Sequence, residues 1–163
     1  MRNGEFLYCL HQNLGNEYIK NIVIFVEEGS DLFFDSPKIT KIIRKTRPTY
    51  KDLFEYCNQN YNGEACIVAN ADIIFDDTLR HFDSVNMHKN FYALSRWEIS
   101  TGDGKNWEIE PYENAASQDS WIFRTPIPTS DDMNYTMGKP GCDNKITYLF
   151  KLLNYNVYNY PGL

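Results

Sequence analysis

The sequence predicts an α/β protein: a three-layer α/β/α sandwich around a mostly parallel sheet. Apolar segments rich in β-branched residues alternate with amphipathic helical segments, which is the pattern of strand, helix, strand units with right-handed crossovers. The chain has 163 residues, a length that suits one hydrophobic core. No internal repeat, low-complexity tract or linker divides it. Residues 1–163 are therefore expected to form a single domain.

The first elements are expected to be a helix followed by two strands. Residues 4–14 carry apolar side chains at helical spacing and are followed by Gly15, a usual helix stop. Residues 20–27 read KNIVIFVE, a continuous apolar run of the kind found in strands that are buried on both faces. Residues 39–43 (ITKII) are again β-branched and form the second expected strand.

The next segments predict a capped helix and a strand. Thr49 begins the sequence TYKD, which fits the start of a helix that is expected to end near Asn60. Residues 65–76 (ACIVANADIIFD) predict a strand whose end is interrupted by Asn70, Ala71 and Asp72.

The remaining elements are predicted from shorter patterns. Residues 91–99 and 120–123 are the later strands. The polar, Gly-containing segment 100–106 between them is expected to form a loop over a cleft. A final helix is expected over residues 143–153, followed by a strand at 156–160.

Charge and cysteine usage exclude several classes of function. Lys and Arg number 16 against 22 Asp and Glu, a net charge of −6, so the chain lacks the basic surface needed to bind nucleic acid. The longest apolar run, residues 22–26, is far shorter than the roughly 20 residues of a membrane span, and no leader-like segment opens the chain. The 4 Cys are scattered without a CxxC pair, which indicates reduced thiols in a cytoplasmic protein.

The interruption after the predicted strand 65–69 is the first candidate site. Ligands of open α/β sheets bind beyond the carboxyl ends of the strands. An exposed carboxylate such as Asp72 can hold a divalent cation there, and oxygen ligands favour Mg²⁺ or Mn²⁺. In the alternative interpretation Asp72 caps a turn, and Asp76 and Asp77 cap the helix that follows.

The stretch IVANADIIFDDTL, residues 67–79, resembles the region around the D-x-D element of nucleotide-sugar-dependent glycosyltransferases of the GT-A fold. In that family an aspartate pair after a central strand coordinates a metal and the donor diphosphate. Asn70 stands in the first position, Ala71 in the second and Asp72 in the third. The resemblance thus implies donor binding at these residues and a divalent cation, Mn or Mg, on Asp72. Asn70 would supply an amide oxygen or a contact to the ribose.

Two further segments fit the same resemblance. RPTYKDLFEYCN, residues 47–58, resembles the donor-side loop and helix, which implies that Arg47 or Tyr50 lies near the nucleotide. Capping and packing are their alternative roles.

YALSRW, residues 92–97, resembles the strand after the D-x-D element. The resemblance implies that Arg96 contacts a phosphate and that Trp97 stacks on a sugar. Alternatively, Arg96 pairs with an acid such as Glu98.

Two polar segments near the C-terminus supply the candidate acids. In SQDSWIF, residues 117–123, Gln118 and Asp119 precede an apolar strand and suit hydrogen bonds to sugar hydroxyls, unless they form an ordinary polar loop. In GKPGCDNKITYLF, residues 138–150, Asp143 begins a helix. GT-A enzymes often keep an acid at such a position, facing the acceptor hydroxyl, and it is the general base in inverting members. Its alternative role is a helix N-cap. Asp119 is the next candidate for the base.

Together these segments imply a glycosyltransferase that moves a sugar from a nucleoside diphosphate donor to a hydroxyl of a glycan or protein acceptor. One alternative is a non-catalytic nucleotide-sugar or glycan-binding module, to which Asn70 points. A metal-dependent phosphoryl hydrolase is another alternative, and it would need a second carboxylate or a His beside Asp72. GT-A domains normally open with a nucleotide-binding strand, whereas this chain enters a helix almost directly. An exposed sheet edge, and hence a homo-oligomer, is therefore expected.

Overall fold

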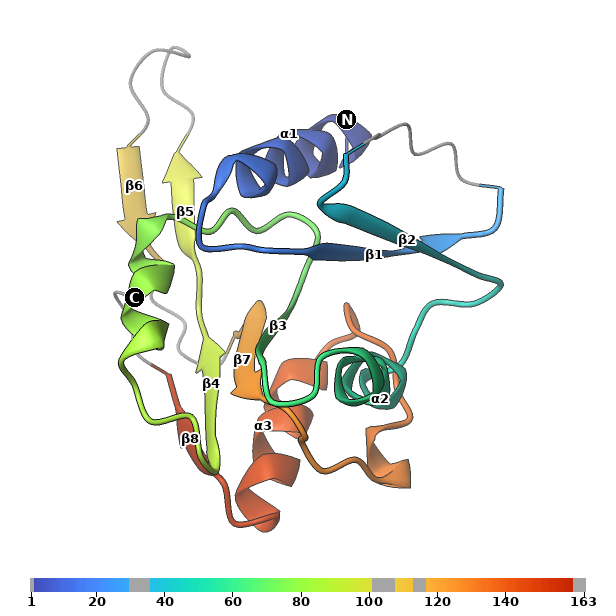
Figure 1. The fold of residues 1–163 in the computed structure, drawn as a ribbon, viewed down its shortest axis with the longest axis vertical. Helices are drawn as coiled ribbons and strands as arrows, with labels where there is room; N and C mark the ends of the chain where they lie inside the picture. Colours follow the sequence, from blue (N-terminus) through green and yellow to red (C-terminus); the bar gives the residue numbers. More distant parts are fainter. Residues whose placement is uncertain (1, 30–35, 101–107, 113–116, 160–163) are drawn as a thin grey trace.

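The computed structural model describes residues 2–29, 36–100, 108–112 and 117–159, and it shows a mixed α/β protein (Figure 1). Its elements in chain order are α1 (Arg2–Gly15), β1 (Ile22–Glu27), β2 (Ile39–Arg44), α2 (Tyr50–Asn60), β3 (Ala65–Ala69), η1 (Asp77–Asp83), β4 (Asn90–Leu94), β5 (Trp97–Ser100), β6 (Glu108–Pro111), β7 (Ser120–Arg124), η2 (Asp131–Met133), α3 (Cys142–Leu152) and β8 (Asn156–Tyr158). No helix in the described ranges is long and apolar enough to cross a bilayer.

The described strands form three sheets. β1 and β2 make a parallel pair, β5 and β6 an antiparallel pair, and the largest sheet has the order β3-β7-β4-β8. Within it β7 runs antiparallel to both β3 and β4, whereas β8 runs parallel to β4. The predicted α/β class is confirmed. The prediction of one mostly parallel sheet is wrong for the described strands. β7 lies between β3 and β4 and runs antiparallel to both, and β1 does not pair with β3.

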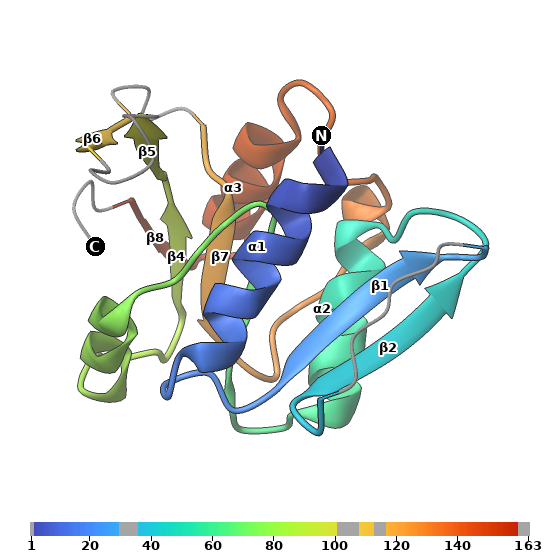
Figure 2. The same ribbon diagram turned by 90° about the horizontal axis from the view of Figure 1, so that it is seen from above.

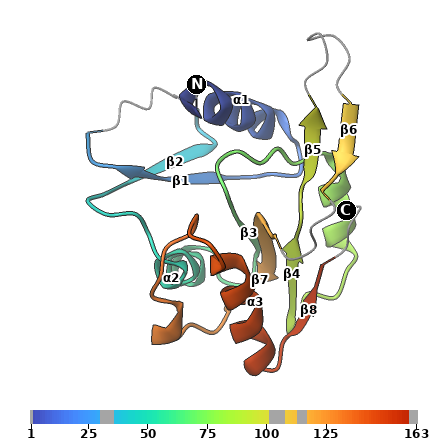
Figure 3. The ribbon, with the colours of Figure 1, turned by 180° about the vertical axis from the view of Figure 1, so that it is seen from behind.

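Helices lie on both sides of the β1–β2 pair, whereas α2 and α3 pack on the same face of the largest sheet. The view from above (Figure 2) shows α2 behind β1, and the view from behind (Figure 3) shows β1 and β2 between α1 and α2. Asn13, at the end of α1, donates to the carbonyl of Ile73 (2.8 Å) and accepts from the amide of Phe75 (2.9 Å). These bonds hold the chain that leaves β3 against α1.

The main core is aromatic and lies between α2, α3 and the four-stranded sheet. Phe54 of α2 is fully buried and meets the rings of Phe91, Phe123 and Phe150 edge-on, with centroids 5.2 to 6.2 Å apart. Edge-to-face pairs of this kind add to the energy of apolar burial. This packing fixes α3 against β7, and thereby positions the start of α3 beside the start of β7.

Most predicted elements are confirmed, and α2 begins as its sequence indicates. The hydroxyl of Thr49 accepts from the amide of Asp52 (3.2 Å), and the Asp52 carboxylate accepts from the amide of Thr49 (2.9 Å), which is a capping box. In α1 the buried side chains are Cys9 and Leu10, whereas Leu7 of the predicted apolar face is 38% exposed. β1 is only partly buried, since it lies in a two-stranded sheet rather than inside a larger one.

Three boundaries differ from the prediction. β3 ends at Ala69, because the residues that were expected to continue it bond to α1 instead. The single strand predicted over residues 91–99 is two strands, β4 and β5, which belong to different sheets. β6 was not predicted. Of the loop predicted over residues 100–106, Ser100 belongs to β5 and the rest lies outside the described residues. Position 160 of the last predicted strand also lies outside them.

Candidate functional site

A cavity of about 170 Å³ lies where β3 ends, β7 begins and α3 starts. Because β3 and β7 are antiparallel, the carboxyl end of one strand meets the amino end of the other. The cavity is lined by Asn70, Gln118, Asp119, Trp121, Gly138, Lys139, Pro140, Gly141, Cys142 and Asp143. Four residues proposed from the sequence, Asn70, Gln118, Asp119 and Asp143, are thus brought together from three separate segments.

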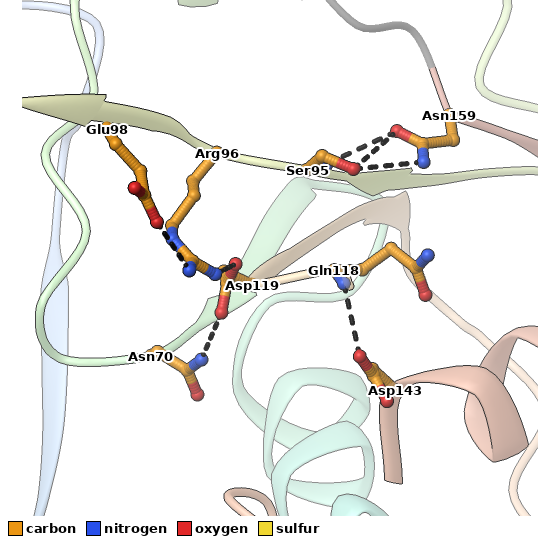
Figure 4. Close-up of polar contacts among 8 residues, drawn as sticks. All are labelled: Asn70, Ser95, Arg96, Glu98, Gln118, Asp119, Asp143 and Asn159. Atoms are coloured by element: carbon orange, nitrogen blue, oxygen red, sulfur yellow. Dashed lines mark hydrogen bonds and ion pairs between the residues drawn. The ribbon is translucent and has the colours of Figure 1, made fainter. Parts of the chain in front are cut away.

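Asp119 is held on both carboxylate oxygens (Figure 4). Its Oδ1 accepts from the side-chain amide of Asn70 at 2.8 Å, and its Oδ2 accepts from Nη1 of Arg96 at 2.7 Å. Arg96 also bonds Glu98 at 2.9 Å, and its guanidinium lies 4.1 Å from the ring centre of Tyr112. Partial burial opposes the charge of Arg96, but its hydrogen bonds to the two carboxylates prevail and raise its pKa. Arg96 thus pairs with Glu98, as the alternative interpretation of the sequence expected, and it also pairs with Asp119.

Asp143 lies in the first turn of α3 and lines the same cavity. The N-cap is Gly141, whose φ of 76° is left-handed, so Asp143 itself is not the cap residue. The carboxylate of Asp143 accepts from the amide of Asn144 at 2.9 Å and from the amide of Gln118 at 3.3 Å (Figure 4). The second bond ties the start of α3 to the segment before β7, and the helix dipole favours a negative charge at this end.

Gln118 is a buried residue that joins the two halves of the site. Its side-chain oxygen accepts from the hydroxyl of Thr147, one turn further along α3, at 3.2 Å. The positions of Asp119 and Asp143 relative to each other are therefore set by Gln118 as well as by core packing.

Arg47 and Tyr50, which the resemblance places near a nucleotide, have different environments. Arg47 is exposed and donates to the carbonyl of Met137 at 3.5 Å; its Nη1 lies 3.3 Å from where a Cβ on Gly138 would stand. Arg47 therefore borders the loop that lines the cavity. Tyr50, in contrast, is fully buried, and its hydroxyl donates to the sulfur of Cys142 at 3.7 Å. Burial, followed by the neighbouring Cys142, raises the pKa of Tyr50. The packing role of Tyr50 is the one observed.

The other predicted ligand contacts lie outside the cavity lining. Ala71 and Asp72 are exposed on the turn after β3, and Trp97 is 44% exposed on β5. Asp72 lies toward α1: burial first, and the Asp72 charge second, raise the pKa of Cys9.

The described residues contain no group of three or more His, Cys, Asp and Glu that could hold a metal ion. A divalent cation at Asp72 would therefore need phosphate oxygens of a bound nucleotide and water to complete its set of ligands.

Among the other residues of the cavity lining, Trp121, Lys139 and Cys142 were not candidates from the sequence. The sequence could have indicated Trp121, because it follows Asp119 by two residues and alternate residues of a strand share a face. Trp121 is 1% exposed, and its Nε1 has no hydrogen-bond partner in the described structure. An unpaired buried N–H costs about 1–3 kcal/mol.

Comparisons with protein-family models, with curated proteins and with solved structures found no match to this chain.

Proposed function

We propose that this chain is a GT-A-like glycosyltransferase domain, which transfers a sugar from a nucleoside diphosphate donor to a hydroxyl of a glycan or protein acceptor. The observation that carries the proposal is that Asp143 lines the same cavity as Asn70 and Asp119. A carboxylate that lines a sugar-sized cavity is suited to accept a hydroxyl proton. The three-layer arrangement of a GT-A domain is part of this proposal. It is supported by the position of β1 and β2 between α1 and α2 (Figure 3).

In the proposed reaction, an acceptor hydroxyl lies against the carboxylate of Asp143. The hydroxyl oxygen attacks the anomeric carbon and forms the new glycosidic bond, while the bond from that carbon to the diphosphate oxygen breaks. The hydroxyl proton passes to Asp143, and the bonding electrons leave with the diphosphate. Arg47, which bonds Met137 beside the cavity, and Lys139, which lines the cavity, would neutralise the negative charge on the departing diphosphate. Arg96 is bound by two carboxylates, so its role is to position Asp119.

A divalent cation, Mn²⁺ or Mg²⁺, belongs to the proposal at Asp72. When bound, it would neutralise charge on the donor diphosphate. The residues that would act on the acceptor, Asp143 and Asp119, are separate from it.

The second candidate is a non-catalytic nucleotide-sugar or glycan-binding module of the same fold. Both oxygens of Asp119 are engaged by Asn70 and Arg96, and Asp72 lies outside the cavity lining. Such a site can hold a ligand whether or not a carboxylate in it acts as a base. Turnover distinguishes this candidate from the enzyme.

The test is calorimetric titration with a panel of nucleoside diphosphates and their sugars, with and without MnCl₂, followed by measurement of released sugar. We expect binding together with release. In Asp143→Asn, turnover should fall roughly 100-fold or more while donor affinity stays unchanged. Asp132→Asn, an exposed change on η2, is the matched control. Binding without release in the native protein would favour the module, and native turnover in Asp143→Asn would exclude Asp143 as the base and leave Asp119.

A further inference from the structure

Two of the thiols of the chain are in contact in the main core. All four cysteines are free. Cys57 lies on α2 and Cys66 on β3, and both pack in the apolar cluster between this helix and the four-stranded sheet. A hydrogen bond joins their side chains. Two sulfurs that already touch can be joined as a disulfide without a large rearrangement of the backbone.

The packing of α2 on the sheet accounts for this contact. Cys57 follows Phe54 by three residues, so the two side chains share a face of the helix. Phe54 meets the ring of Phe123 of β7 edge-on, with centroids 5.2 Å apart. Cys66 is the register partner of Phe123 in the antiparallel β3–β7 pair, so their side chains lie on one face of the sheet. The helix face and the sheet face that carry the two cysteines therefore pack on each other.

The two sulfurs have different environments. The hydrogen bond from Cys57 lowers the pKa of Cys66, whereas the same bond, followed by burial, raises the pKa of Cys57. Because the thiolate is the nucleophilic form, Cys66 is the sulfur that reacts first. Cys66 is 9% exposed and Cys57 is only partly buried, so the pair lies at the margin of the core.

The other two cysteines have neighbours of a different kind. Cys9 lies on α1, where burial first, and the charge of Asp72 second, raise its pKa. The sulfur of Cys142 accepts from the hydroxyl of Tyr50 at 3.7 Å. These two thiols supply matched controls within the same chain.

We propose that Cys57 and Cys66 form a site of reversible oxidation, at which a hydroperoxide converts the two thiols into one internal disulfide. This inference goes beyond the proposed function and does not rest on it. The pair lies outside the lining of the cavity, so it can be oxidised whether or not the chain transfers a sugar.

The reaction has two steps. The sulfur of Cys66 attacks one oxygen of the hydroperoxide, the O–O bond breaks, and the other oxygen takes up the thiol proton and leaves as an alcohol or, from hydrogen peroxide, as water. The sulfur of Cys57 then attacks the resulting sulfenic acid at Cys66. The S–S bond forms, the S–O bond breaks, and water leaves with the proton of Cys57. The two thiols are oxidised by two electrons, and these electrons reduce the hydroperoxide.

The test treats the native full-length chain with hydrogen peroxide, alkylates the remaining thiols under denaturing conditions and counts them by mass spectrometry. We expect the number of alkylated thiols to fall from four to two, and dithiothreitol to restore all four. A glutamate-specific protease cuts after Glu64, between the two cysteines. Digestion without reduction should therefore yield a cross-linked pair of peptides that contain Cys57 and Cys66.

Single serine variants assign the site. Cys57→Ser and Cys66→Ser should form no internal disulfide, whereas Cys9→Ser and Cys142→Ser should still lose two thiols reversibly. In Cys57→Ser the sulfenic acid of Cys66 has no neighbouring thiol, so further peroxide should oxidise it to a form that dithiothreitol does not reduce. The peptide map of the native chain keeps the test decisive if a variant folds poorly.

Several results would overturn the proposal. Four thiols that remain after peroxide treatment would exclude an oxidation site, and a loss of thiols that dithiothreitol does not restore would exclude a reversible one. A disulfide that joins any other pair of cysteines, or that joins two chains, would exclude Cys57 and Cys66 as the partners. None of these results bears on the transfer of a sugar, which is measured separately by turnover.

Discussion

Replacing Asn70 by aspartate would place a second carboxyl against Asp119. In the native chain the Asn70 amide donates to Oδ1 of Asp119 at 2.8 Å, and the Asp119 side chain is only 14% exposed. Two charges at 2.8 Å repel by about 6 kcal/mol at an effective dielectric constant of about 20. Keeping a proton on a carboxyl of ordinary pKa, about 3.9, costs about 4 kcal/mol at pH 7. Proton uptake costs less than repulsion, so the variant pair will share one proton.

The stability of Asn70→Asp will therefore depend on pH. The folded variant holds a proton that the unfolded chain releases above pH about 3.9, so the loss of stability grows as the pH rises. We expect a loss of about 4 kcal/mol at pH 7 and about 1.5 kcal/mol at pH 5, a slope of about 1.4 kcal/mol per pH unit.

Urea unfolding, followed through tryptophan fluorescence, to which the buried Trp121 contributes, measures this slope. Asn70→Ala is the matched control. It removes the hydrogen bond to Asp119 without adding a carboxyl, so its loss of about 1.5–3 kcal/mol should be the same at pH 5 and pH 7. An aspartate variant whose loss is equal at the two pH values would refute the reasoning.

The remaining predictions concern the cation, the cap and the sheet edges. Asp72→Ala should abolish any strengthening of UDP binding by MnCl₂ in calorimetry while the melting temperature holds, and an unchanged Mn²⁺ dependence would exclude Asp72 as the ligand. Thr49→Ala should lower the free energy of unfolding by about 1 kcal/mol in urea titration. The hydrogen bond from the Thr49 amide lowers the pKa of Asp52 in the folded chain. The stability that ionised Asp52 adds should therefore be complete above its ordinary pKa of 3.8 and disappear as the pH falls through the lower folded pKa. A loss of unfolding free energy in Asp52→Asn that persists in acid would contradict this. β1 and β3 each have an unpaired edge in the described sheets, so sedimentation velocity should detect association as protein concentration rises, and a monomer at every concentration would exclude it.

The elements that local sequence determines are those that were predicted correctly. Thr49 and Asp52 lie three residues apart and satisfy each other, so the start of α2 could be identified from four letters. The apolar runs of β1 and β7 likewise have the composition of strands.

The missed boundaries depend on residues far apart in the chain. β4 stops before Ser95, whose amide bonds the Asn159 side chain across 64 positions, and Arg96 turns toward Asp119. Within the cavity, the sequence identified four of the polar residues that line it but not that Trp121 lines it too. Packing of α3 on β7 creates that neighbourhood, and no pattern within either segment specifies it.

The break between β1 and β3 affects the cooperativity of unfolding. Within the described ranges no strand pairing joins the two sheets, and α2 connects them through side chains: Tyr56 meets Phe25 of β1, and Phe54 meets Phe123 of β7. Apolar side-chain contacts constrain the relative position of two sheets less than a hydrogen-bonded strand pairing does. The backbone amides of β1 and β2 can therefore exchange hydrogen with solvent through local opening while the four-stranded sheet stays closed. The cavity is built on that sheet. Its geometry would therefore survive fluctuations that transiently separate β1 from β2.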